Sequence, residues 1–130
     1  MIGLDTTTII DLFNGDKNLI SVLENINEPL STTIINYQEI VFGLNIFNKE
    51  HLAEYAKYNE FFNNLLVFPI TKQSAKKASL VLWSLKKLGQ EIDRFDCMIA
   101  GIFLEQGISS VITRNTKHFS VIRGLKVISY

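Results

Sequence analysis

The sequence predicts an α/β fold, a three-layer α/β/α sandwich in which helices cover both faces of a mostly parallel sheet of roughly five strands. Short apolar runs alternate with longer segments in which apolar residues recur at helical spacing. Glycine and proline punctuate the chain between several of these segments. The length of 130 residues and the hydrophobic content of 47% suit a single domain, residues 1–130, with its own core.

The N-terminal half is expected to hold three strands and four helices. The expected strands are residues 2–4, the LSTT run at 30–33, and LLVFPI at 65–70, which Pro69 closes. The expected helices cover about residues 7–13, 16–26, 36–47 and 50–65. The last of these is supported by apolar residues at helical spacing, namely Leu52, Tyr55, Phe62 and Leu65.

The C-terminal half is expected to hold two helices and two strands. A long helix over 71–88 carries one apolar stripe, formed by Ala75, Ala78, Leu82 and Leu85. Gly89 is its expected C-cap, and a second helix over 93–106 is ended by Gly107. SSVIT at 109–113 and LKVIS at 125–129 are the expected fourth and fifth strands. Because parallel strands bind ligands beyond their carboxyl ends, residues that follow the strands are the first place to look for a site.

Charge is unevenly distributed along a chain that is neutral overall. Residues 1–70 carry nine acidic side chains and three lysines, whereas residues 71–130 carry ten basic and four acidic side chains. Such asymmetry indicates either a surface that faces a polyanion or the solvated face of one lysine-rich helix. The lysines in question are Lys72, Lys76, Lys77, Lys86 and Lys87.

Other features of the sequence indicate a soluble, cytoplasmic protein. Cys97 is the only cysteine, which excludes an intrachain disulfide and suits a reducing compartment. The N-terminus lacks the pattern of a signal peptide, because Asp5 interrupts its first apolar residues. No uncharged run is long enough to span a membrane, so no membrane association is expected.

Three acidic residues stand where apolar strands give way to helices, namely Asp5, Glu39 and Asp96. They are 34 and 57 positions apart, so only folding can bring them together. Clustered carboxylates repel one another, and a divalent cation relieves the repulsion. This arrangement predicts Mg²⁺- or Mn²⁺-dependent phosphate chemistry.

Helix capping is the competing interpretation of these acids. Asp5 can cap the helix that follows it. Glu39 lies three residues after Asn36, and Asp96 lies three residues after Asp93, so both pairs fit a capping-box-like pattern. The two interpretations are compatible, because two helix N-termini aimed at one cleft lower the cost of gathering carboxylates and also favour phosphate.

The segment after the fourth expected strand adds polar groups without a carboxylate. Asn115 can ligate an ion weakly or hold a metal-bound water, and Arg114 can pair with a phosphate. The alternative is an ordinary turn. His51 and His118 have no partner at ligand spacing, so neither a zinc site nor a Ser/His/Asp triad is expected. Glycine-rich phosphate loops are absent.

Taken together, these segments resemble the PIN domain family and, within it, the VapC-type toxins of toxin–antitoxin pairs. The resemblance rests on the order and spacing of four motifs. These are LDTTTIIDLF at 4–13, STTIINYQEIVFGL at 31–44, I-x-x-x-D-x-x-I-A at 92–100, and VITRNTKHF at 111–119. Thr7 replaces a frequent asparagine, and His118 stands where many VapC-like sequences have aspartate.

The resemblance implies a Mg²⁺- or Mn²⁺-dependent endoribonuclease that forms a homodimer and is inhibited by a cognate antitoxin. Asp5, Glu39 and Asp96 match the three metal-binding acids of the family. Asn115 lies where many members place a fourth acid, so we expect it to orient a metal-bound water and the site to bind metal more weakly. Thr6 or Arg114 is expected to steady the substrate phosphate.

Other functions and folds fit the same pattern. A housekeeping PIN nuclease of RNA processing or decay is one alternative, and a catalytically weak PIN-like module that binds RNA or protein is another. A flavodoxin-like or receiver-like domain also places acids at strand ends, but the paired acids and the late lysine of a receiver are not evident. Homodimerisation gains some support from the helix at 50–65, whose aromatic residues cover more than one core stripe.

Overall fold

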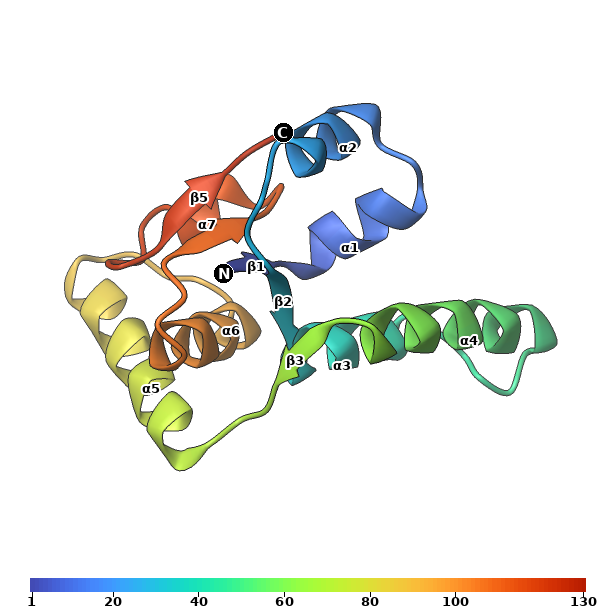
Figure 1. Cartoon of the computed structure of the whole chain (residues 1–130). Coiled ribbons are helices and arrows are strands. Elements are labelled where there is room, and N and C mark those ends of the chain that lie inside the picture. The colour runs from blue at the N-terminus through green and yellow to red at the C-terminus, as the bar shows by residue number, and fades with distance from the viewer.

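The computed structural model describes all of residues 1–130 and contains one five-stranded sheet (Figure 1). The strands are β1 (Ile2–Leu4), β2 (Leu30–Thr33), β3 (Leu66–Phe68), β4 (Ser110–Ile112) and β5 (Lys126–Ile128). They lie in the order β3-β2-β1-β4-β5, and every neighbouring pair is parallel. The predicted sheet is therefore confirmed, and it is parallel throughout.

Seven helices connect and cover these strands. They are α1 (Thr6–Phe13), α2 (Lys17–Glu24), α3 (Ile34–Phe42), α4 (Lys49–Asn63), α5 (Lys72–Lys87), α6 (Arg94–Glu105) and α7 (Thr116–Phe119). In Figure 1, α5 and α6 lie on one side of the strands, whereas α1 and α4 lie on the other. Two separate apolar clusters follow the same division, one around α6 and one around α1 and α4. The three-layer α/β/α prediction is confirmed.

The third helix begins earlier and ends earlier than predicted. Its N-cap is Thr33, whose hydroxyl accepts the backbone N–H groups of Ile35 and Asn36. Asn36 completes a capping box by accepting the Thr33 N–H at 3.1 Å, so the predicted N-cap role of Asn36 is wrong. The helix ends at Phe42 with Gly43 as its C-cap, and the side chain of Asn48 caps α4, so residues 43–47 are not helical.

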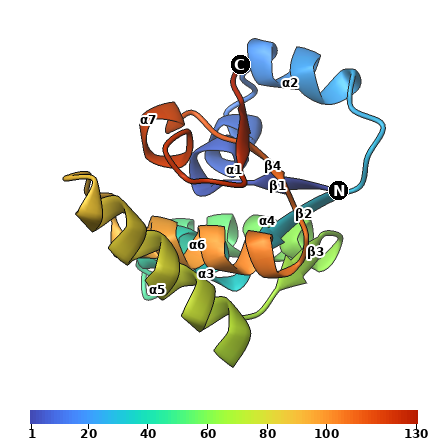
Figure 2. The same ribbon diagram turned by 90° about the vertical axis from the view of Figure 1, so that its left-hand side faces the viewer.

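The buried stripe of α5 is rotated relative to the prediction. Ser74, Ala78 and Leu85 are buried, whereas Ala75 is exposed. The cause is the close approach of α6, since a Cβ placed on Gly101 would lie 2.5 Å from the Ser74 carbonyl oxygen and 2.7 Å from the Ala78 nitrogen. Figure 2 shows α5 crossing over α6 on the same side of the sheet. Small side chains at the crossing are required for this packing.

The five lysines noted in the sequence all belong to α5. Four of them are exposed, and the fifth, Lys77, is partly buried and donates to the Leu104 carbonyl oxygen at 3.4 Å. The four exposed lysines lie on the solvent-facing side of this helix, which agrees with both interpretations of the charge asymmetry.

The chain changes the direction in which it adds strands to the sheet at the central strand β1. From β1 the chain adds β2 and β3 on one side, then returns to add β4 and β5 on the other. The carboxyl ends of β1 and β4 are therefore adjacent, and the Asp5 N–H donates to the Ile112 carbonyl oxygen at 3.1 Å. Such a switch point opens a crevice in which parallel sheets bind ligands. None of the helices is both long and apolar enough to cross a membrane.

Candidate active site

The three predicted acids approach one another at this switch point. Asp5 follows β1, Glu39 lies in α3, and Asp96 lies in the first turn of α6. Asp5 and Asp96 are buried, with exposed fractions of 2% and 6%, and Glu39 is partly buried. The charges of Asp5 and Asp96 both raise the pKa of Glu39, so the three carboxylates share one electrostatic environment.

Asp5 is held by neutral donors on both of its oxygens. Thr113, the residue after β4, donates its hydroxyl to Oδ2 at 2.7 Å, and Thr7 donates to the same oxygen at 3.4 Å. The Asn36 amide donates to Oδ1 at 3.2 Å. Asp5 occupies the N-cap position of α1, but its side chain does not cap that helix. Its carboxylate is instead fixed at the carboxyl edge of the sheet.

Glu39 is connected to Asp5 through two polar side chains. Its Oε1 accepts the Thr6 hydroxyl at 2.6 Å, and the Thr6 oxygen accepts the Asn36 amide at 3.0 Å. Asn36 therefore links Asp5 to Glu39 from a fully buried position. The predicted capping role of Glu39 is wrong, because Thr33 and Asn36 already form the capping box of α3.

Asp96 has a partner that the sequence did not reveal. Asp93 is the N-cap of α6, as predicted, and accepts the Phe95 N–H at 2.7 Å. Asp96 Oδ2 lies 2.7 Å from Nδ1 of His118, which belongs to the short helix α7. The two residues are 22 positions apart, so no ligand-spacing pattern relates them. The motif at 111–119 had pointed to this region, where His118 stands at a position that many VapC-like sequences fill with aspartate.

The cluster gathers negative charge, and His118 beside Asp96 is the basic side chain that contacts it. Burial raises the pKa of Asp5, of Glu39 and of Asp96, and mutual repulsion raises the last two further. The Thr and Asn donors lower the pKa of Asp5, and the His118 hydrogen bond lowers that of Asp96. No lysine or arginine forms an ion pair with any of the three acids.

A divalent cation suits this set of donors. Mg²⁺ and Mn²⁺ prefer carboxylate oxygens, and their charge would offset the repulsion that burial strengthens. In the structure, no group of three or more His, Cys, Asp or Glu side chains converges closely enough to hold a metal ion. The carboxylate oxygens are thus of the right chemical type for a divalent ion. To bind the ion, the three side chains would have to move closer together than they are in the structure.

The remaining predicted site residues lie at the same edge with different partners. Asn115 is the N-cap residue of α7, and its side chain makes no capping bond. The Thr6 hydroxyl is engaged with Glu39, so this side chain acts as a support for the acid. The Nε atom of Arg114 lies 3.4 Å from Oδ2 of Asp11 on α1. Tyr130 also donates to this Asp11 oxygen.

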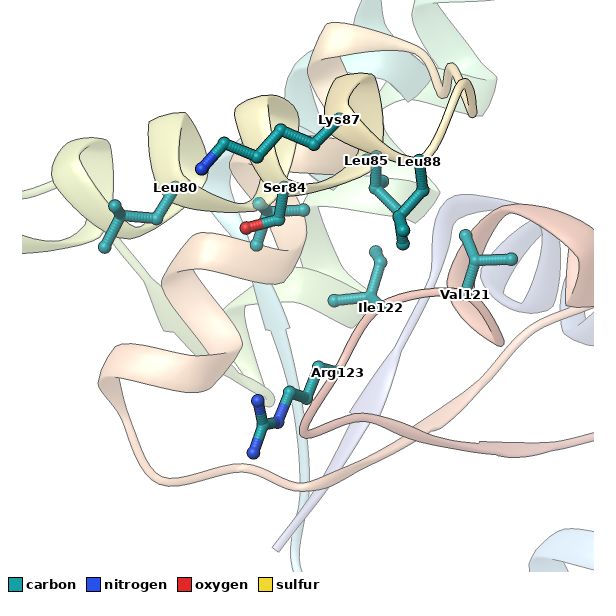
Figure 3. Close-up of a pocket in the computed structure, with 9 residues that line it drawn as sticks. Leu80, Ser84, Leu85, Lys87, Leu88, Val121, Ile122 and Arg123 are labelled. Carbon is teal, nitrogen blue, oxygen red and sulfur yellow. The ribbon is translucent and has the colours of Figure 1, made fainter.

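A separate apolar cavity of about 470 Å³ lies away from these residues (Figure 3). It is lined by Leu80 and Leu85 of α5, by the C-cap residue Leu88, and by residues 121–123, which precede β5. None of the candidate site residues lines it. The cavity carries Lys87 and Arg123 but no carboxylate, so it lacks the chemistry expected of the acidic site.

Comparisons with known proteins agree with the fold. A family model described as the PIN domain matches residues 2–125. No curated protein matches the chain. Among solved structures, a chain of VapBC2 from Rickettsia felis, bound to a promoter DNA fragment, superposes with a TM-score of 0.86 at 20% identity. The match covers 100% of this chain and 99% of that one.

Two further solved structures are similar over nearly their full length. A chain of a toxin–antitoxin complex from Klebsiella pneumoniae has a TM-score of 0.77 at 21% identity, with coverage of 98% of this chain and 96% of that one. A chain of VapBC-1 from nontypeable Haemophilus influenzae has a TM-score of 0.80 at 26% identity, with coverage of 99% and 98%. All three share the architecture described above.

Proposed function

The chain belongs to the PIN domain family, and from that premise we propose that it is a metal-dependent endoribonuclease that hydrolyses RNA phosphodiester bonds. One observation carries the proposal. Three acids from distant parts of the chain approach one another at the switch point, where threonine and asparagine donors hold Asp5 and Glu39 and no lysine or arginine pairs with any of the three. Asp5, Glu39 and Asp96 would hold one or two Mg²⁺ or Mn²⁺ ions.

Each side chain of the site has a distinct role in this proposal. When bound, the ion supplies activation of a water for in-line attack and stabilises charge on the transition state and the departing 3′ oxygen. Thr113 and Asn36 hold Asp5, Thr6 holds Glu39, and His118 holds Asp96. The side chain of Asn115, which makes no capping bond, would orient the attacking water. Arg114 would contact the substrate phosphate.

The biological role proposed is that of the toxin of a type II toxin–antitoxin pair. The support is the likeness to chains of VapBC and toxin–antitoxin complexes, which also makes a cognate antitoxin the expected partner. We propose cytoplasmic action on RNA and a homodimer. A housekeeping PIN nuclease remains the second enzymatic role, and the presence of a neighbouring antitoxin reading frame would separate the two.

A second candidate function is a PIN-like module that binds RNA or protein without cutting. The observation that favours it is the lack of a converged ligand set in the structure. The observation against it is the retention of all three acids together with their supporting donors.

Cleavage of a mixed RNA pool by the purified protein tests the proposal, with Mg²⁺, Mn²⁺ or EDTA present. Asp96→Asn removes one carboxylate of the cluster, and Asp93→Asn is its matched control, because asparagine caps a helix as well as aspartate does. We expect metal-dependent cutting by the wild type and by Asp93→Asn, and none by Asp96→Asn. A folded, antitoxin-free wild type that binds RNA but never cuts it would overturn the nuclease proposal in favour of the binding module.

Induced expression in a bacterial host tests the toxin role separately. Growth arrest by the wild type that is absent with Asp96→Asn would support it. Cleavage in vitro with unimpaired growth would favour the housekeeping nuclease instead.

A further inference from the structure

We infer that Arg114 is a phosphate-binding arm beside the acidic cluster, and that Asp11 and Tyr130 are the residues that position it. The inference rests on the proposed function, because the ligand it assigns is a phosphate of single-stranded RNA. It goes further by naming two residues outside the candidate metal site that set how RNA is held.

The backbone of Arg114 is fixed next to the acids. Arg114 follows Thr113, whose hydroxyl donates to Asp5 at 2.7 Å. The Arg114 N–H donates to the Thr7 hydroxyl oxygen at 3.2 Å, and Thr7 itself donates to Asp5 at 3.4 Å. The start of the Arg114 side chain is therefore tied to the same hydrogen-bond network that orients Asp5.

The Arg114 guanidinium forms an ion pair with Asp11, whose Oδ2 lies 3.4 Å from Nε. This aspartate lies one helical turn beyond Thr7 on α1, so the Arg114 side chain runs along that helix. Asp11 is buried, with 8% of its surface exposed, whereas 63% of the Arg114 side chain is exposed. A buried carboxylate thus holds an arginine whose outer part faces solvent.

Tyr130 fixes Asp11 in turn. Its hydroxyl donates to Oδ2 of Asp11 at 2.5 Å, the oxygen that lies nearest Arg114 Nε. Burial, together with the Asp11 contact, raises the pKa of Tyr130 to about 12, so the phenol stays protonated and donates at neutral pH. The Asp11 carboxylate therefore retains the Tyr130 hydrogen bond when Arg114 moves away. Arg114 is thus not required as a hydrogen-bond donor to this buried acid.

The guanidinium keeps the donors that a phosphate requires. Arginine has five N–H groups in a rigid fork, and its recorded contact with Asp11 is through Nε, 3.4 Å from Oδ2. The two terminal nitrogens make no ion pair or hydrogen bond with the protein. A fork held at one edge and open at the other suits bidentate binding of a phosphate.

Binding of a labelled single-stranded RNA in EDTA, measured over a range of salt concentrations, tests the arm without any cleavage. The variant is Arg114→Gln, and the matched control is Arg123→Gln, which removes a cation that lines the apolar cavity (Figure 3). We expect Arg114→Gln to weaken binding about tenfold, the effect of one charge-assisted hydrogen bond. The slope of log affinity against log salt should also fall by about 0.7, the value of one phosphate contact on a single strand.

Equal affinities of Arg114→Gln and Arg123→Gln would overturn the inference and leave the nuclease proposal intact. A wild-type protein that binds no RNA at all would instead overturn the proposed function. The two failures are therefore distinguishable in one experiment.

The positioning role is tested by a double-mutant cycle with Asp11→Asn. This change removes a negative charge, so a purely electrostatic effect would tighten RNA binding. If Asp11 positions Arg114, Asp11→Asn should weaken RNA binding in the protein that retains Arg114. The same change should cause no loss of RNA affinity in the Arg114→Gln variant. Tyr130→Phe, which changes no charge, should weaken binding in the same Arg114-dependent way. Tighter binding by Asp11→Asn, or an equal loss in both backgrounds, would overturn the role of Asp11.

Discussion

His118 Nδ1 lies 2.7 Å from Asp96 Oδ2, which joins the short helix after β4 to the first turn of α6. The contact leaves Oδ1 of Asp96 without a protein hydrogen-bond partner. A carboxylate held through one oxygen presents the other in a fixed direction, which is the usual function of a hydrogen bond behind a metal ligand.

Replacing His118 by alanine should weaken metal binding and cleavage by about 10–100-fold. The hydrogen bond lowers the pKa of Asp96, so its loss should raise that pKa. Because protonated Asp96 cannot bind a metal, the loss of metal affinity at acidic pH should then begin at a higher pH. Calorimetric titration with Mn²⁺ at several pH values measures both effects. The control is His51→Ala, whose ring accepts the Asn45 N–H in the loop before α4. Equal results for the two variants would contradict the supporting role of His118.

The stability of the metal-free protein should fall as pH rises because of Glu39. Burial raises the pKa of Glu39 above its ordinary value of 4.5, so the folded state holds this proton more tightly than the unfolded chain does. The resulting stabilisation is complete below the ordinary pKa and is lost as pH rises through the raised pKa. Glu39→Gln does not titrate and should not show this loss.

Urea denaturation in EDTA from about pH 4 to 8 compares the two proteins. The free energy of unfolding of Glu39→Gln, relative to wild type, should increase with pH, while the exposed control Glu60→Gln should follow the wild type. If the free energies of unfolding of wild type and Glu39→Gln changed with pH in parallel, the pKa of Glu39 would not be raised in the folded protein.

The crossing of α5 and α6 should not tolerate a methyl group at residue 101. A Cβ on Gly101 would meet the Ser74 carbonyl oxygen at 2.5 Å, and backbone atoms cannot move aside as a side chain does. We expect Gly101→Ala to lower the free energy of unfolding by about 1–3 kcal/mol. Gly43→Ala is the control, since its Cβ would meet only the Ile40 and Glu39 carbonyl oxygens, at 3.3 and 4.0 Å. Equal losses in chemical denaturation would contradict tight packing at the crossing.

The proposed homodimer should depend on the end of α3 and the segment between α3 and α4. Phe47 in that segment is 97% exposed and Phe42 at the end of α3 is 71% exposed, whereas Tyr58 and Phe62 of α4 are buried against the protein's own core. We expect Phe47→Asp to shift the protein toward the monomer in light scattering, because large exposed apolar side chains mark interfaces. Leu88→Asp, at the apolar cavity, is the control. A dimer broken only by Leu88→Asp would place the interface at that cavity.

The elements of the sheet could be predicted because their signals are local. Each apolar run became a strand within two residues of its expected ends, since burial on both faces of a parallel sheet requires a continuous apolar run. Asp5 could be placed at the carboxyl edge of the sheet for the same reason. Asp96 lies in α6, which follows α5 and not a strand, so only the resemblance of the motifs placed it beside Asp5.

The details of the site depend on contacts that no local pattern encodes. Asn36 and Thr33 are both good caps, and only the fold shows that Thr33 takes this role while Asn36 turns toward Asp5. The helix α7 has four residues, too few for a periodic signal. The partners of Asp96, Asp11 and Asp5 lie 22, 119 and 108 positions away in the chain.

The position of β4 beside β1 also sets when the site can form during synthesis. Asp5, Glu39 and Asp96 are all translated before Thr113 and His118, which hold two of them. Until residues 110–119 are made, one side of the central strand has no partner and Asp5 lacks its shortest hydrogen bond. A chain that ends before residue 110 therefore lacks both of these supports. For an enzyme proposed to cut RNA, we expect this order of synthesis to limit cleavage by the incomplete chain.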